Sequence, residues 1–224
     1  MPMSRRLGLV LALLLFVLVA PADEQKKLKG LPLAVKPAQE EHIADLVVTA
    51  AGQKCDNWSW AAGVETLLKR QDVDLEQQFW LLRAYAGTVC ISPLGDVEKL
   101  ASAINGEYVL DDGRKVRLVA RFLPGPPSQT DWMIMSLRRG HPFLLLWRGH
   151  AYLVQGLLFD EYIAPTGARL FEVRELRLLD PFAQGDRQRV IFVKGRDDAS
   201  EIDGTLDVDA TFIKPPNWLE PGKN

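Results

Sequence analysis

Residues 53–62, QKCDNWSWAA, decide how this sequence is interpreted, because they have the form of a loop that leads into a helix. Asn57 is a residue type that favours helix N-caps, and apolar residues recur with helical spacing from Trp58 through Arg70. Ser59 therefore falls in the first turn of a predicted helix. Unpaired backbone N–H groups and the positive end of the helix dipole stabilise negative charge at such a position.

The first 22 residues have the form of a secretory signal peptide. Arg5 and Arg6 precede an apolar run over residues 7–20, which is shorter than the roughly 20 residues that span a bilayer. Residues 20–22, Ala-Pro-Ala, fit a cleavage site before Asp23. We expect a secreted or periplasmic protein with no membrane span after signal cleavage; an uncleaved membrane anchor is the alternative.

The charge balance and the absence of several motifs argue against certain classes of partner and cofactor. The chain has 27 Lys and Arg residues against 29 Asp and Glu residues, well mixed along the sequence. A slightly acidic chain of this kind does not indicate nucleic acid as a partner. The sequence also lacks CxxC pairs, an HExxH helix, a glycine-rich phosphate loop and a GxSxG elbow, so we expect no metal and no cofactor.

Cys55 and Cys90 are the only two cysteines of the chain. In an oxidising compartment they most simply form one disulfide, which would close a loop of about 35 residues and contribute about 4 kcal/mol through loop-closure entropy. Two free thiols are the alternative.

The order of predicted elements indicates the fold class. Residues 23–43 are polar and contain prolines, so they are expected to be an extended lead-in, and the acidic, proline-rich residues 196–224 a surface tail. Between them, residues 44–195 form one domain in which helices precede strands. This order predicts an α+β fold, with an N-terminal helical lobe packed against a C-terminal antiparallel sheet lobe.

The predicted helices cover residues 57–70, 75–85, 95–104 and 131–139, and the predicted strands cover residues 107–110, 115–122, 143–147, 151–158, 170–179 and 189–194. The second helix is expected to turn Phe79, Trp80 and Leu82 inward.

The motif at residues 53–62 resembles the active-site helix of papain-like cysteine peptidases, in particular a compact bacterial branch with Trp-Cys-Trp-Ala-Ala at this place. The resemblance implies that Gln53 is the oxyanion glutamine and that Ser59 stands where the nucleophilic cysteine belongs. It also supports Cys55 as a disulfide partner rather than a nucleophile. The implied ligand class is a peptide or a protein.

Two histidines compete for the role of general base, because Arg-Gly-His occurs twice and ends at His141 and at His150. His141 precedes Pro142 and indicates a turn before a strand. His150 is the second residue of GHAYLVQGLLFD, residues 149–160, which resembles the family's histidine strand. We therefore predict His150 as the base.

Asp180 is the predicted third member of the site. If the strand that starts at His150 turns near residues 165–167 and returns antiparallel, residues whose numbers sum to about 330 lie opposite each other. That pairing brings Asp180 to His150, whereas Asp160 would lie about 33 Å along the strand. The segment LLDPF, residues 178–182, also resembles the turn that supplies this residue in the family.

A serine in place of the cysteine changes the expected chemistry. A thiol at a helix N-terminus beside a histidine loses its proton readily, whereas a hydroxyl must be deprotonated during attack. The leading hypothesis is a catalytically impaired peptidase fold that keeps a cleft for a peptide or partner. The alternatives are an active hydrolase or acyltransferase that uses Ser59, His150 and Asp180, and a structural or interaction domain with a closed cleft.

Overall fold

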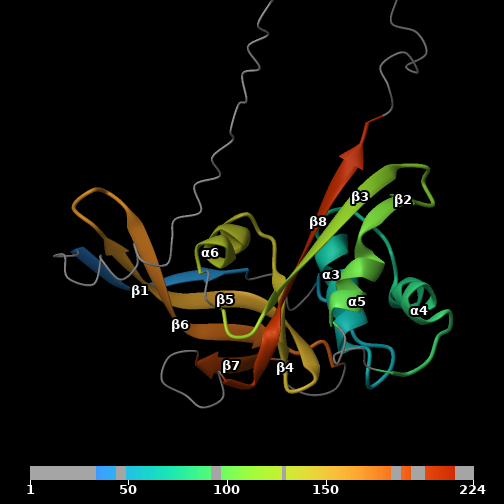
Figure 1. Cartoon of the computed structure of the whole chain (residues 1–224), viewed down its shortest axis with the longest axis horizontal. Helices are drawn as coiled ribbons and strands as arrows, with labels where there is room; N and C mark the ends of the chain where they lie inside the picture. The colour runs from blue at the N-terminus through green and yellow to red at the C-terminus, as the bar shows by residue number, and fades with distance from the viewer. Residues whose placement is uncertain are drawn as a thin grey trace, which may run out of the picture.

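The computed structural model describes residues 34–43, 49–91, 97–127, 130–182, 188–192 and 200–214 (Figure 1). These residues form a mixed structure of helices and one antiparallel sheet, which confirms the predicted α+β class. The helices are α3 (Ser59–Lys69), α4 (Gln77–Tyr85), α5 (Val97–Ile104) and α6 (Asp131–Arg138). The predicted signal peptide lies outside the described residues.

The sheet contains eight strands, in the order β2-β3-β8-β4-β5-β6-β7, with β1 paired to β5 off this path. Every pairing is antiparallel. The strands are β1 (Ala34–His42), β2 (Gly106–Val109), β3 (Lys115–Pro124), β4 (Phe143–Trp147), β5 (His150–Ile163), β6 (Arg169–Leu179), β7 (Gln188–Phe192) and β8 (Ile202–Ile213).

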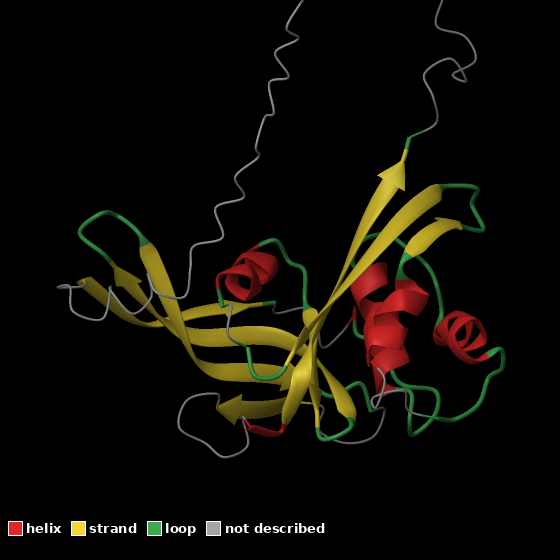
Figure 2. Cartoon of the chain, viewed as in Figure 1, coloured by secondary structure: helices red, strands yellow, loops and turns green. Residues whose placement is uncertain are grey.

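Three of the helices gather on one side of the molecule, and the fourth lies apart from them (Figure 2). α3 packs against α4, β5, β4 and β8, and α5 packs against β3 and α4. α6 instead packs against β1 and β5. The helical part therefore covers the middle of the sheet, where β5 begins.

Helix α3 is the central helix of the core. Every residue from Ser59 to Leu68 is buried, and with the exception of Glu65 the sequence of this stretch, SWAAGVETLL, is small or apolar on all sides. Gly63 faces Leu144 of β4, and a Cβ built on this glycine would lie 2.5 Å from the Leu144 Cδ2 atom. Close approach of helix and sheet thus fixes the distance between the start of α3 and strand β5.

The elements between residues 59 and 192 fall close to their predicted ranges, and the hairpin of β2 and β3 is confirmed. Two details are wrong. Trp58, not Asn57, precedes the first helical residue of α3, and the Asn57 side chain donates instead to the Cys90 carbonyl oxygen. In α4 the buried residues are Gln77, Trp80 and Leu81, whereas Leu82 is 54% exposed.

The prediction that residues 196–224 form a surface tail is wrong for residues 202–213. These residues form β8, which lies between β3 and β4 inside the sheet. The acidic residues Asp207 and Asp209 suggested a solvated tail, but they alternate with buried Leu206 and Val208, which is the period of a strand.

The predicted extended lead-in, residues 23–43, contains strand β1, which pairs with the second half of β5. Its side chains are almost all exposed, so main-chain pairing rather than apolar burial holds it. Within the described part of the chain, no helix has both the length and the hydrophobicity of a membrane span.

Candidate functional site

Ser59 is the first residue of α3, and only 2% of its surface is exposed. Its Oγ atom accepts a hydrogen bond of 3.1 Å from the backbone N–H of Ala151, the second residue of β5. Since Ala151 directly follows His150, this contact places the Ser59 oxygen within about 5.5 Å of the His150 Cα atom. The structure therefore brings Ser59 to the start of the predicted histidine strand.

His150 and Asp180 form a hydrogen-bonded pair, with 2.9 Å between His150 Nε2 and Asp180 Oδ1. β5 and β6 pair antiparallel with residue numbers that sum to 332 or 333, close to the predicted sum, and Asp180 directly follows β6. Asp180 Oδ1 also accepts from the Phe182 backbone N–H at 3.0 Å, which orients the carboxylate.

The pairing with a carboxylate assigns the proton of a neutral His150 ring to Nε2, which leaves Nδ1 as the acceptor nitrogen. A carboxylate partner of this kind fixes the ring and its tautomer, which is one requirement of a general base. No hydrogen bond joins it to the Ser59 hydroxyl, whose contact is with the Ala151 amide. The His150–Asp180 pair is therefore formed, but the Ser59 hydroxyl is not hydrogen-bonded to it.

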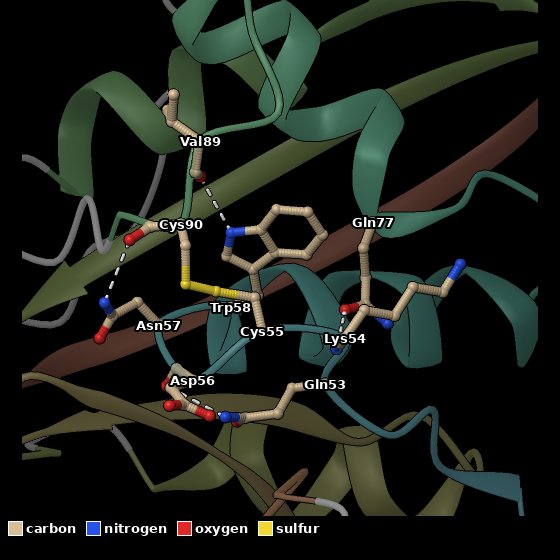
Figure 3. Close-up of a disulfide and its surroundings, with 9 residues drawn as sticks. All are labelled: Gln53, Lys54, Cys55, Asp56, Asn57, Trp58, Gln77, Val89 and Cys90. Atoms are coloured by element: carbon tan, nitrogen blue, oxygen red, sulfur yellow. Dashed lines mark hydrogen bonds between the residues drawn. A yellow bond between two sulfur atoms is a disulfide. The ribbon is translucent and has the colours of Figure 1, made fainter.

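Gln53 lies against the turn that carries Asp180. Its backbone N–H donates to the Pro181 carbonyl oxygen at 2.9 Å, and its side chain is 8% exposed. The side-chain Nε2 donates to the Asp56 carbonyl oxygen at 3.0 Å, within the loop that precedes α3 (Figure 3). One of its two amide protons is therefore committed to the loop and is not available to a bound oxyanion.

The loop that precedes α3 is fastened to the chain after α4 by three links, all visible in Figure 3. Cys55 and Cys90 form a disulfide with Cα atoms 6.1 Å apart, as predicted. Trp58 Nε1 donates to the Val89 carbonyl oxygen at 3.0 Å, and Asn57 Nδ2 donates to the Cys90 carbonyl oxygen at 3.2 Å. Covalent and polar links together therefore fix the first turn of α3.

His141, the rejected alternative base, lies in the turn before β4. Its N–H donates to the Ser136 carbonyl oxygen, and its own carbonyl oxygen accepts from the Ser136 hydroxyl. Asp160, the rejected third member, is buried on β5, where it accepts from Arg174 and from the Ala38 backbone. Among the described residues, neither His141 nor Asp160 is hydrogen-bonded to Ser59 or to the His150 pair.

Sequence reasoning missed Gln77, the first residue of α4. It is 1% exposed and bonds the main chain on both sides of Gln53. Gln77 shares the buried face of α4 with Trp80 and Leu81, at spacings of three and four residues. A polar residue on the apolar face of a predicted helix is the signal that would have identified it.

A cavity of about 210 Å³ lies away from these residues, at the end of β3. Leu123, Pro124, Gly125, Pro126, Pro127, Trp132 and Thr205 line it. Within the described ranges, no group of three or more His, Cys, Asp and Glu side chains is arranged to hold a metal ion.

Comparison of the chain with family profiles, with curated proteins and with solved structures finds no match in any of the three. The case for a function therefore depends on the geometry of the site itself.

Proposed function

We propose that this chain is an exported, catalytically impaired member of the papain-like peptidase fold, and that it binds a peptide or protein partner rather than cleaving it. The observation that carries the proposal is the state of Ser59. Its hydroxyl is buried, accepts from the Ala151 N–H and makes no hydrogen bond to the His150 ring. A serine nucleophile needs a base within hydrogen-bond reach to remove its proton during attack.

The neighbouring groups support the same interpretation. Gln53, the expected oxyanion donor, bonds the Asp56 carbonyl oxygen. An oxyanion hole works through donors aimed in advance at the developing charge, and the bond to Asp56 leaves only one of the two Gln53 amide protons for that role. Export is supported by the form of the first 22 residues and by the Cys55–Cys90 disulfide.

A second candidate is an active hydrolase or acyltransferase that uses Ser59. The observation in its favour is the His150–Asp180 pair, in which a carboxylate 2.9 Å from the ring fixes the histidine, although it bonds Nε2 where the carboxylate of Ser-His-Asp enzymes bonds Nδ1. A small rotation of the Ser59 side chain during substrate binding would have to replace the Ala151 contact with one to His150.

Substitution of the nucleophile position separates the two candidates. We expect the wild type to cleave synthetic peptides barely or not at all and to resist a serine-directed fluorophosphonate. Ser59→Cys is expected to gain hydrolysis and alkylation by iodoacetamide, because the helix N-terminus and His150 lower the pKa of a thiol. The gain should disappear in a Ser59→Cys/His150→Ala double variant.

The reverse order of activities decides against the proposal. A wild type that turns over peptide and labels with fluorophosphonate, together with an inactive Ser59→Cys variant, makes Ser59 a working nucleophile. Binding is tested separately by titrating a peptide library into the wild type and following the NMR signals of His150 and Tyr152, whose rings lie 4.6 Å apart. Absence of any shift in that titration favours the third hypothesis, a structural domain with a closed site.

A further inference from the structure

The buried side chain of Gln77 uses its amide on three partners at once. Its Oε1 accepts from the Lys54 backbone N–H at 3.0 Å (Figure 3), and its Nε2 donates to the Gly52 carbonyl oxygen at 3.0 Å. The second Nε2 proton goes to Glu65 Oε2 at 2.7 Å. With 1% exposure, Gln77 has no water to replace any of these bonds.

The two backbone partners are the groups on either side of Gln53. In an extended residue the preceding carbonyl and the following N–H point to one side, and the residue's own N–H points to the other. On the first side, the Gln77 amide bonds the Gly52 carbonyl oxygen and the Lys54 N–H. On the second side, the Gln53 N–H donates to the Pro181 carbonyl oxygen at 2.9 Å. Gln77 therefore acts on Gln53 as a neighbouring strand would, opposite the turn that carries Asp180.

The third partner ties this contact to the helix that carries Ser59. Glu65 lies two turns along α3 and is 4% exposed. Its other oxygen accepts from Lys69 Nζ at 2.7 Å, and this hydrogen bond raises the pKa of the Lys69 ammonium. The charge of Glu65 is thus balanced within α3, which leaves its second oxygen to hold the Gln77 amide.

We propose that Gln77 is the positioning residue of the candidate site. It holds Gln53 at a fixed place between the start of α3 and the Asp180 turn. The inference rests on the proposed function only in taking Gln53, Ser59 and His150 as the site, and it holds whether or not the site cleaves a bond.

The chemistry of the contact requires an amide. Gln77→Ala removes all three bonds, and Gln77→Glu keeps the shape but sets a carboxylate against the Gly52 carbonyl oxygen and the Glu65 carboxylate. That carboxylate would repel both until it takes up a proton, when it regains one donor. Acidification should therefore restore part of the contact in Gln77→Glu and none of it in Gln77→Ala.

Gln71 supplies a matched control. Its Nε2 donates to the Val208 and Leu67 carbonyl oxygens, and its Oε1 accepts from the Ala210 backbone N–H. It therefore fastens the two sides of Asp209 on β8 as Gln77 fastens the two sides of Gln53. Gln71→Ala removes the same number of bonds, two of them likewise to the main chain of another segment, at a place remote from His150.

The test compares the full-length protein with Gln77→Ala, Gln77→Glu, Gln71→Ala and Gln71→Glu by NMR. We expect amide hydrogen exchange at Gln53 to accelerate about tenfold or more in Gln77→Ala, and the His150 ring ¹⁵N signals to shift. In Gln71→Ala these site signals should stay at their wild-type values while those of β8 change. In Gln77→Glu the difference between the site signals and those of wild type at the same pH should shrink as the pH falls, and in Gln71→Glu the site signals should match those of wild type at each pH.

Equal changes at Gln53 and His150 in the Gln77 and Gln71 variants, or no change in Gln77→Ala, overturn the inference. If Gln77→Ala does not fold, Gln77→Glu at two pH values decides the question. Fluorophosphonate labelling of the wild type would contradict the proposed function, because it would make Ser59 a reactive nucleophile. It would not affect the comparison of the Gln77 and Gln71 variants, so failure of the proposed function can be told apart from failure of this inference.

Discussion

The Ser59 hydroxyl has a structural task in this fold, whatever its chemical one. The Ala151 N–H is fully buried and points away from β4 at the place where β6 has already ended, so a side chain must accept its hydrogen bond. Ser59 supplies that acceptor from the first turn of α3. A cysteine would supply a weaker one, because sulfur is a poor acceptor.

Replacing Ser59 by alanine should therefore destabilise the protein. Loss of the Ser59 oxygen that accepts from the buried Ala151 N–H should cost about 1–3 kcal/mol, and chemical denaturation measures this cost. Ser102→Ala is the control, because the Ser102 hydroxyl bonds the Glu98 carbonyl oxygen on the exposed face of α5. An equal loss in both variants would contradict the structural role of Ser59.

At the residue scale, the sequence predicted those site residues whose positions follow from a motif spacing or from strand pairing. Ser59 follows Gln53 by six positions, and the pairing of two long strands brought Asp180 to His150 by counting alone. It was uninformative where one side chain bonds the main chain of another segment. The composition of α4 does not indicate that the Gln77 side chain bonds residues 52 and 54. That contact depends on how the helices pack.

At the scale of elements, the disulfide joins the loop before α3 to the chain after α4. The Cys55–Cys90 bridge encloses both helices, so it restricts their freedom in the unfolded chain. Trp58 and Asn57 hold the same segments without it, which means that the folded arrangement should survive reduction.

The double variant Cys55→Ser/Cys90→Ser should fold but unfold at lower denaturant. A closed loop of this length contributes about 4 kcal/mol by chain entropy, and reduced wild type should match the variant. Urea denaturation of the variant and of wild type with and without reductant measures the difference. Two alkylatable thiols in the purified, unreduced wild type would contradict the bridge itself.

Element prediction from sequence failed most clearly at β8. Apolar residues that recur with a period near 3.6 predict helices, and α3, α4, α5 and α6 were all expected from the sequence. In β8 the alternation of apolar residues with aspartates was masked by the acidic and proline-rich composition around it. A central strand supplied from the end of the chain is also a non-local pairing, which local sequence patterns do not encode.

At the scale of the whole molecule, β8 joins two groups of strands that do not otherwise pair with each other. It pairs with β3, which carries β2 and contacts α5, and with β4, which leads to the histidine strand. The β2–β3 hairpin and the strands β4 to β7, among them the strand of His150, thus belong to one sheet through β8 (Figure 1).

Gly204 is the point where β8 leaves no room for a side chain. A Cβ there would lie 2.4 Å from the Phe122 ring and 2.5 Å from the Leu123 carbonyl oxygen. Gly204→Ala should cost about 1–3 kcal/mol, because the backbone oxygen cannot move without breaking the pairing with β3. Gly87→Ala, where a Cβ meets nothing within 4 Å, is the control in thermal denaturation, and equal melting shifts would contradict the close approach.

The same strand gives the stability of the molecule a defined pH dependence. Burial raises the pKa of the Asp207 carboxyl above its ordinary value, the nearby Asp209 charge adds to the effect, and the 2.8 Å ion pair with Arg121 opposes it. A carboxyl with a raised pKa in the folded state binds more protons folded than unfolded. Its contribution to the free energy of unfolding is therefore most favourable at low pH.

That contribution should fall as the pH rises from the unfolded pKa of about 3.9 through the folded pKa, and it should stay low above it. Asp207→Asn removes the titration, so the stability of the variant relative to wild type should increase over the same pH window in urea titrations. Asp209→Asn removes the nearby charge that helps to raise the pKa of Asp207. This variant should therefore show a smaller pH dependence of stability than wild type, without losing it. If wild type and Asp207→Asn instead show parallel stability curves across that window, Asp207 does not titrate with a raised pKa in the folded sheet.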